Sequence, residues 1–188
     1  GCSVLMSYGM PLVGLVALAV ITAGRAWRTP VFPVTVAAAL VPVLGFAVAG
    51  FAWWEAYPVL HERYWDGIAS IRPASYWLWG NLAALAVITG PAVWGGLGVL
   101  ATRVRPLTQR ALPEPERVVL LLAGAMMLVV IAADASRMSK SEDERIWVPF
   151  VPWLTLSVAL LPPRWRSPAL LAQVVTALAV QHLAYTTW

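Results

Sequence analysis

The sequence is poor in cysteine and in charge, and each shortage excludes a class of chemistry. Cys2 is the only cysteine, so an internal disulfide and a Cys-x-x-Cys metal or redox site are impossible. Charged residues make up 12% of the chain, and no Asp, Glu, Lys, Arg or His lies in the middle of a long apolar segment. A charge there costs about 2.5–3.5 kcal/mol and usually serves ion or proton passage. Its absence argues against a proton-coupled carrier or an ion channel.

Several enzyme motifs are missing as well. The sequence contains no GxxxxGKS phosphate loop and no GxSxG nucleophile turn, which excludes cytosolic ATP chemistry on this stretch. His61-Glu62 does not begin an HExxH zinc motif, because Trp65 stands where the second histidine is needed. We therefore predict no metal site and no cofactor, and leave a divalent cation open for the complete protein.

Apolar residues dominate what is present. Hydrophobic residues make up 60% of the 188 residues, and the mean hydropathy is +0.74. Six segments approach the roughly 20 residues that a membrane-spanning helix needs. They run from about Val4 to Ala23, Val31 to Phe51, Tyr76 to Ala101, Arg117 to Ala133, Ile146 to Leu161, and Ala169 to the end. The predicted fold class is all-α, a polytopic membrane helix bundle of about six transmembrane helices forming one domain over residues 1–188.

Basic residues are distributed unevenly among the loops between these segments. Loops 24–30, 102–117 and 162–168 hold eight of the thirteen Lys and Arg residues, whereas the other two loops hold seven of the nine acids. The positive-inside rule places the first set in the cytoplasm and the acidic set outside a plasma membrane. Topology thus explains the net charge of +4 better than a nucleic-acid partner does. Both chain ends then lie outside without a signal peptide, so we expect the C-terminal part of a longer chain.

The densest run of charge spans residues 139–145 and passes directly into an apolar segment that begins at Ile146. Ser141-x-x-Glu144 fits a capping box, and acids in a first turn complement the helix dipole. A charged cluster at a membrane surface is also where a polytopic protein meets a polar substrate. Both readings stay open, and one residue can do both.

The first acidic loop, Trp53 to about Ser75, mixes carboxylates with aromatic rings. Such a mixture suits a sugar, because acids accept hydroxyl hydrogen bonds while aromatic faces cover the ring. The candidate sugar contacts are Trp54, Glu55, Tyr64 and Asp66. The same aromatics suit the interfacial belt of any membrane protein.

Three of the five basic residues on the predicted outer side lie beside apolar segments, against the positive-inside bias. Arg72, Lys140 and Arg145 would bind an anionic group such as a lipid-linked phosphate, or simply pair with nearby glutamates. Between helices, Gly45 with Ala49 and Ala92 with Gly96 form small-x-x-x-small pairs that allow close packing. We also expect Gln173, Thr176 and Gln181 to hydrogen-bond other helices.

The stretch 139–153 resembles a motif in multispanning actinobacterial membrane proteins that look like GT-C-type glycosyltransferases, the polyprenyl-phosphate-sugar-dependent class that includes protein mannosyltransferases. The matching residues are Ser139, Lys140, Glu142, Glu144, Arg145, Ile146, Trp147, Pro149, Phe150, Pro152 and Trp153. Further landmarks are Ser7-Tyr8-Gly9, Arg72-Pro73, Asn81 to Leu85, and Gly90-Pro91-Ala92. The sequence departs from the motif at Ser141, where a glycine is expected, and at Asp143, where an apolar residue is expected.

The resemblance implies inverting transfer of a sugar from a polyprenyl-phosphate donor to an acceptor at the extracytoplasmic face of the plasma membrane. It places Glu142, Glu144 and Arg145 in donor or acceptor binding, with Arg72 and Lys140 as further candidates for the lipid phosphate. The catalytic acid of this class usually lies in the first outer loop, which we expect upstream, so no catalytic residue is assigned. The expected partners are membrane lipid and a lipid-linked sugar. The alternative is a non-enzymatic membrane protein, either a lipid or polysaccharide transporter subunit or an assembly scaffold.

We predict that the loops Trp53–Ser75 and Asp134–Arg145 lie on one side of the membrane, opposite Arg105 and Arg164, because basic and acidic residues segregate between alternate loops. Single cysteines at positions 63 and 105, probed with an impermeant reagent added outside, should give labelling at position 63 alone. Labelling of both positions would contradict this topology.

Overall fold

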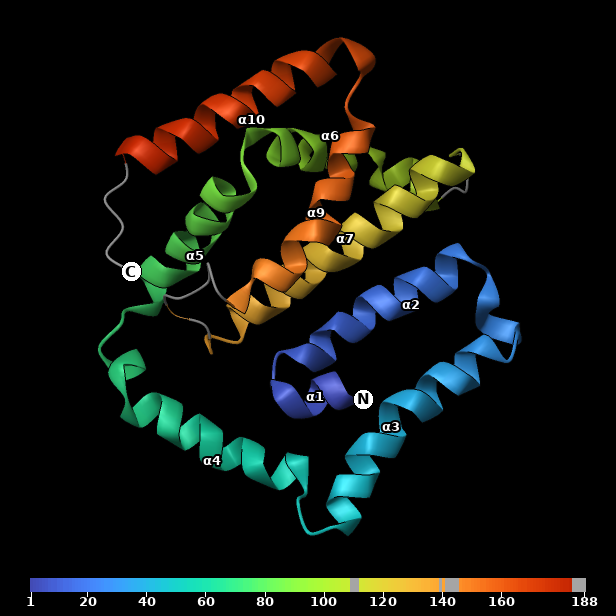
Figure 1. The fold of residues 1–188 in the computed structure, drawn as a ribbon, viewed down its shortest axis with the longest axis vertical. Coiled ribbons are helices and arrows are strands. Elements are labelled where there is room, and N and C mark those ends of the chain that lie inside the picture. The colour runs from blue at the N-terminus through green and yellow to red at the C-terminus, as the bar shows by residue number, and fades with distance from the viewer. Residues whose placement is uncertain (109–111, 139, 141–145, 184–188) are drawn as a thin grey trace.

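The computed structural model describes residues 1–108, 112–138, 140 and 146–183, and this part of the chain is helical with no strand (Figure 1). The α-helices are α1 (Cys2–Met6), α2 (Gly14–Ala23), α3 (Val31–Val48), α4 (Trp53–Asp66), α5 (Ala74–Thr89), α6 (Pro91–Thr108), α7 (Glu114–Ala135), α9 (Val151–Thr155) and α10 (Pro163–Leu183). Short 3₁₀ helices are η1 (Met10–Val13), η2 (Ala26–Arg28), η3 (Ile68–Ser70), η4 (Val148–Phe150) and η5 (Leu156–Leu160). The predicted all-helical fold class is confirmed.

Helix α7 is the centre of the packing. It contacts α2 on one side and α9 with η5 on another, and these segments lie side by side in Figure 1. Met126, Val129 and Val130 of α7 are fully buried, and they pack in one cluster with Val16 of α2 and Leu154 of α9. Helices α5 and α6 complete this core with Leu85, Val93 and Leu97.

Two helices are long and apolar enough to cross a membrane, α3 and α7, and a bent pair formed by α5 and α6 makes a third candidate. The apolar stretches Met10–Ala23 and Val148–Leu160 are shorter than a span. Helix α10 has 21 residues but carries two arginines and two glutamines and fails as a candidate. The described residues therefore support two to three spans, and the six-span arrangement is not confirmed.

The predicted first segment is not one helix. Ser7 adopts an extended conformation (φ −160°, ψ 137°) that ends α1, and the chain restarts as η1 before α2. Ser7 compensates the interruption locally, because its Oγ accepts a hydrogen bond from Gly9 N at 3.3 Å and its carbonyl accepts one from Met10 N at 3.1 Å. Pro11, which lacks an N–H, then occupies the first turn of η1, where no donor is needed.

The predicted loop Trp53–Ser75 is mostly helix, which corrects the sequence interpretation. Helix α4 covers Trp53–Asp66 and none of its residues is buried. Its aromatic residues Trp53, Tyr57 and Tyr64 recur at spacings of four and seven, the period of one helix face. The charged residues between these aromatic residues obscured the helical spacing in the sequence. The predicted loop 102–116 is shorter too, because α6 continues to Thr108 and α7 begins at Glu114.

The predicted third segment is broken at Gly90, where the helix direction bends by 112° between α5 and α6. Gly90 has φ +75°, a conformation that side chains rarely adopt, and a Cβ there would lie 2.2 Å from the Gln173 amide. Gln173 of α10 bridges the break: its Nε2 donates to Thr89 O at 2.8 Å, and its Oε1 accepts from Ala92 N at 3.2 Å. The expectation that Gln173 hydrogen-bonds another helix is confirmed.

The predicted fifth segment is irregular because Pro149 and Pro152 remove backbone donors. It runs as η4, one turn of α9 and then η5, and each proline lies in the first turn of its element. The proposed capping box at Ser141 and Glu144 lies outside the described residues.

The two small-residue pairs behave differently. Ala92 and Gly96 are buried, and a Cβ on Gly96 would lie 2.4 Å from the Ser157 carbonyl oxygen of η5. Ser157 Oγ also donates to Val93 O at 3.0 Å, so α6 and η5 touch backbone to backbone. Gly45 of α3 and Ala49 just after its end are exposed, and α3 buries no residue.

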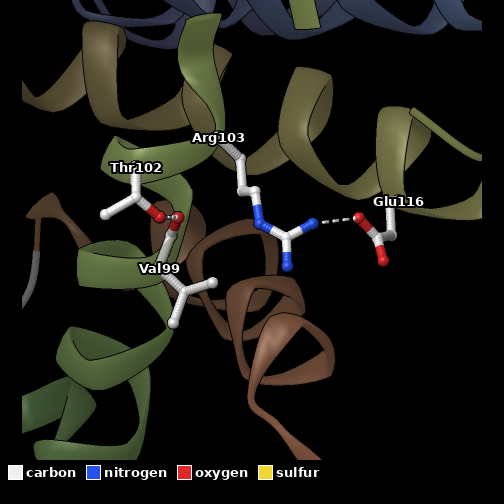
Figure 2. Close-up of polar contacts among 4 residues, drawn as sticks. All are labelled: Val99, Thr102, Arg103 and Glu116. Carbon is white, nitrogen blue, oxygen red and sulfur yellow. Dashed lines mark hydrogen bonds and ion pairs between the residues drawn. The ribbon is translucent and has the colours of Figure 1, made fainter. Parts of the chain in front are cut away.

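A surface ion pair links the C-terminal part of α6 to the first turn of α7. Arg103 Nη1 lies 2.8 Å from Glu116 Oε2, while Thr102 one residue earlier donates to Val99 O within its own helix (Figure 2). Both charged side chains are about 40% exposed, at 43% and 39%, so the pair contributes about 0–1 kcal/mol. Packing holds these helices together more than this pair does.

The backbone contact at Gly96 predicts that Gly96→Ala lowers the free energy of unfolding by about 1–3 kcal/mol, because the η5 backbone must move. Gly98 on the same helix has no atom within 4 Å of a built Cβ, so Gly98→Ala should raise stability by up to about 1 kcal/mol. Denaturation of the two variants in the same detergent checks this pair. Equal effects of the two substitutions would contradict the close approach.

Candidate functional site

Lys140 joins the two acidic loops at the C-terminal end of α7. Its side chain is buried, and Nζ donates to Ala69 O at 2.9 Å and to Arg72 O at 3.0 Å. The ammonium also lies 4.1 Å from the centroid of the Trp65 ring, a cation–π geometry. Two of its three donors are therefore used by backbone carbonyls, and the described contacts are structural. Phosphate binding by Lys140 remains a prediction, and it would have to use the third donor or replace one of these bonds.

Arg72 lies beside Lys140 and is only half-buried. Its Nη1 donates to Lys140 O, and its guanidinium carbon lies 5.4 Å from the centroid of the Trp77 ring. A guanidinium has five N–H donors, so this one keeps donors for a further partner. Of the two cations predicted to bind phosphate within the described residues, Arg72 is the accessible one.

A buried polar pair lies behind these cations. Asn81 Nδ2 of α5 donates to Asp134 Oδ1 of α7 at 2.8 Å, and the two residues are 1% and 7% exposed. The cleft that they share with Trp77, Arg137 and Lys140 has no room for a water-sized molecule. We therefore interpret this pair as a polar tie between α5 and α7. The sequence interpretation treated Asn81 only as a family landmark and Asp134 only as the end of a segment.

A cavity of about 430 Å³ opens on the other face of the same end of α7. The residues that line it come from the Ser7 interruption, α4, the last turn of α7, and the stretch around η4. They are Ser7, Tyr8, Gly9, Leu12, Tyr57, Leu60, Ala132, Ala133, Ser136, Met138, Ile146, Trp147 and Phe150. The landmarks Ser7-Tyr8-Gly9 and Ile146-Trp147 with Phe150, more than 130 residues apart, thus meet around one space.

Aromatic rings connect α4 to this cavity. Tyr8 stacks on Trp53 with ring centroids 4.9 Å apart and lies 5.7 Å from the Tyr57 ring. The extended conformation at Ser7 positions Tyr8 for these contacts. Sequence reasoning named Tyr8 only as part of a family landmark and did not select Trp53 or Tyr57 as contacts, although the spacing of Trp53 and Tyr57 on one helix face was a usable signal.

The predicted sugar contacts do not line the cavity. Trp54, Glu55 and Asp66 are exposed on α4, and Tyr64 is half-buried. Glu142, Glu144 and Arg145 lie outside the described residues, so their roles stay predictions. No cluster of three or more His, Cys, Asp or Glu that could hold a metal occurs in the part of the chain described here.

The opposite end of α7, about 33 Å away for 22 residues, carries different contacts. There Arg103 pairs with Glu116, and Arg117 Nη2 donates to Ala23 O at 3.0 Å. The acidic loops thus touch each other at one end of α7, and at the other end the loop 102–117 contacts the end of α2, where the loop 24–30 begins. The side of the membrane that each end faces stays a prediction.

Comparison of the chain with protein-family models, with curated proteins and with solved structures finds no match. The geometry of this end of the bundle is therefore the basis for the functional argument.

The contacts of Lys140 predict that Lys140→Met lowers the free energy of unfolding by about 1.5–3 kcal/mol, because two buried carbonyls lose a charged donor. Arg63→Met on the exposed surface of α4 is the matched control, with an expected change within about 0.5 kcal/mol. Chemical denaturation of both variants in detergent measures the difference. A Lys140→Met protein as stable as the control would exclude the structural role.

Proposed function

We propose that this chain is part of an integral membrane glycosyltransferase that moves a sugar from a polyprenyl-phosphate donor to an acceptor at the extracytoplasmic face. The observation that carries the proposal is the cavity between α4 and the end of α7, around which two separate family landmarks converge. Landmarks that met only in a hydrophobic core would have a simple packing explanation. Trp147 and Phe150 do belong to the hydrophobic core, but together with Ser7, Tyr8 and Gly9 they also line an open volume.

The lining of the cavity suits a sugar ring. Tyr8 and Tyr57 provide aromatic faces for the apolar side of a pyranose, and they add hydroxyl groups. Ser7 adds a third hydroxyl, while Trp147 and Phe150 form an apolar floor. Binding sites for small molecules combine such an apolar lining with a few polar groups that orient the ligand.

The charged motif is adjacent in sequence to the lining, since Arg145 directly precedes the lining residue Ile146. In the proposed enzyme Glu142, Glu144 and Arg145 bind donor or acceptor, and Arg72 is the further contact for the lipid phosphate. A planar guanidinium suits a phosphate because it can donate two parallel hydrogen bonds. The catalytic base is assigned to no residue of this chain.

The proposal includes a polytopic arrangement of about six spans. The C-terminal end of α7, which Lys140 follows in the chain, lies on the outer side in this arrangement. Helices α3 and α7 and the bent α5–α6 pair supply two to three of these spans. Shorter segments would cross as broken or tilted helices, which is tolerated where the interrupted backbone is buried in protein.

One observation favours the alternative, a lipid or polysaccharide transporter subunit. Transporters use discontinuous helices at the membrane midplane, and α5–α6 is broken by 112° at Gly90. At the break a neutral group, the Gln173 amide, satisfies the backbone. A transporter would move the intact lipid-linked substrate across vesicles, whereas the proposed enzyme cleaves it at the sugar–phosphate bond.

The cavity predicts that Ala133→Phe reduces sugar transfer at least about 10-fold in the complete protein, because a phenyl ring on α7 would fill the space. Ala135→Phe, two residues further along the same helix but exposed and outside the lining, should transfer normally. The measurement is incorporation of labelled sugar from a polyprenyl-phosphate donor in membranes with matched protein levels.

Equal activity of the two variants would remove the cavity from the mechanism. Movement of the labelled lipid without cleavage would favour the transporter instead.

A further inference from the structure

A second cavity, of about 420 Å³, lies between α6 and α10 and shares no lining residue with the proposed sugar-binding cavity. Every residue that lines it has an apolar side chain or none, among them Gly95, Leu161 and Trp165. Gly95, Trp165 and Pro168 are exposed, so the cavity is an open groove on the surface. In a membrane, an apolar groove with an exposed tryptophan at its mouth faces lipid.

Positive charge collects at one end of this groove, and the ion pairs among the described residues include neither of its two arginines. Arg164 and Arg166 flank the lining residue Trp165, and both are exposed. Arg166 Nε lies 3.4 Å from the carbonyl oxygen of Leu161, another lining residue, which places its guanidinium at the rim. Neither α6 nor α10 contains an Asp or Glu.

The two arginines gain little from their own helix. They lie in the first turns of α10, where the helix dipole disfavours cations. Loop 24–30 provides a useful contrast, because Arg25, Trp27 and Arg28 repeat the same residue types on an exposed turn, and none of them lines a described cavity.

We infer that the groove between α6 and α10 binds an anionic phospholipid of the membrane, with one acyl chain in the groove and the headgroup phosphate at Arg164 and Arg166. The groove supplies the apolar surface, and the two arginines select the negative headgroup. A bound chain would fill the space beside Gly90 and Gln173, because Pro91 and Ala92 belong to the lining. The lipid would then hold α10 against the broken helix. This inference is independent of the proposed glycosyl transfer.

The test is native mass spectrometry of the full chain after exchange into micelles that contain dioleoylphosphatidylglycerol or dioleoylphosphatidylcholine. The wild-type protein should retain one phosphatidylglycerol more than it retains phosphatidylcholine. The double variant R164Q/R166Q should bind phosphatidylglycerol about 30-fold more weakly, since each basic residue near an anionic lipid contributes about fivefold. The double variant R25Q/R28Q is the control and should bind as wild type.

A second pair of variants separates the groove from general charge attraction. Gly95→Leu should abolish the extra phosphatidylglycerol by filling the groove, whereas Gly98→Leu, which projects into open space on the same helix, should not. Equal retention by R164Q/R166Q and R25Q/R28Q would overturn the inference. Equal retention of the two lipids by the wild type, or an unchanged Gly95→Leu protein, would overturn it as well.

Discussion

The structure depends on satisfying backbone carbonyls wherever a helix stops inside apolar surroundings. An unsatisfied buried carbonyl costs about 1–3 kcal/mol, and within a membrane no water is available to donate a hydrogen bond to it. In this chain long polar side chains from distant elements provide the missing donors. Arg117 reaches Ala23, Gln173 reaches Thr89, and Lys140 reaches Ala69 and Arg72. Several polar residues of an apolar chain are thus explained by helix ends alone.

Two interruptions of the helices, at Ser7 and at Gly90, lie beside the open spaces. At Ser7 the extended backbone brings Tyr8 against α4, and the cavity forms beneath that contact. At Gly90 the 112° bend turns α6 across the bundle, and the groove beside α10 lies along its first turns. Straight helices packed along α7 would close both volumes. The same backbone breaks that cost stability therefore position the two candidate binding surfaces.

The candidate site could be predicted only in part. The charge pattern indicated that the two acidic loops belong together, and Lys140 does join them through Ala69 and Arg72. The pattern could not tell a cation that binds a ligand from one that caps a carbonyl, because both need the same donor at the same loop. The pairing of Tyr8 with Tyr57 was not predicted, because a cavity is a property of three-dimensional packing and these residues are 49 positions apart.

Apolar content and length were sufficient to predict an all-helical chain and to locate α3 and α7, because a long apolar run in lipid must bond its backbone internally. The same reasoning suggested the interhelical role of Gln173, since a buried amide needs a partner. Hydropathy could not show where helices break or in which direction they continue. Contacts between residues far apart in sequence decided the positions and directions of these breaks. Gln173 donates to the carbonyl of Thr89 at the end of α5, and the absence of a side chain on Gly96 lets α6 approach the backbone of Ser157. Only the assembled bundle brings these groups together.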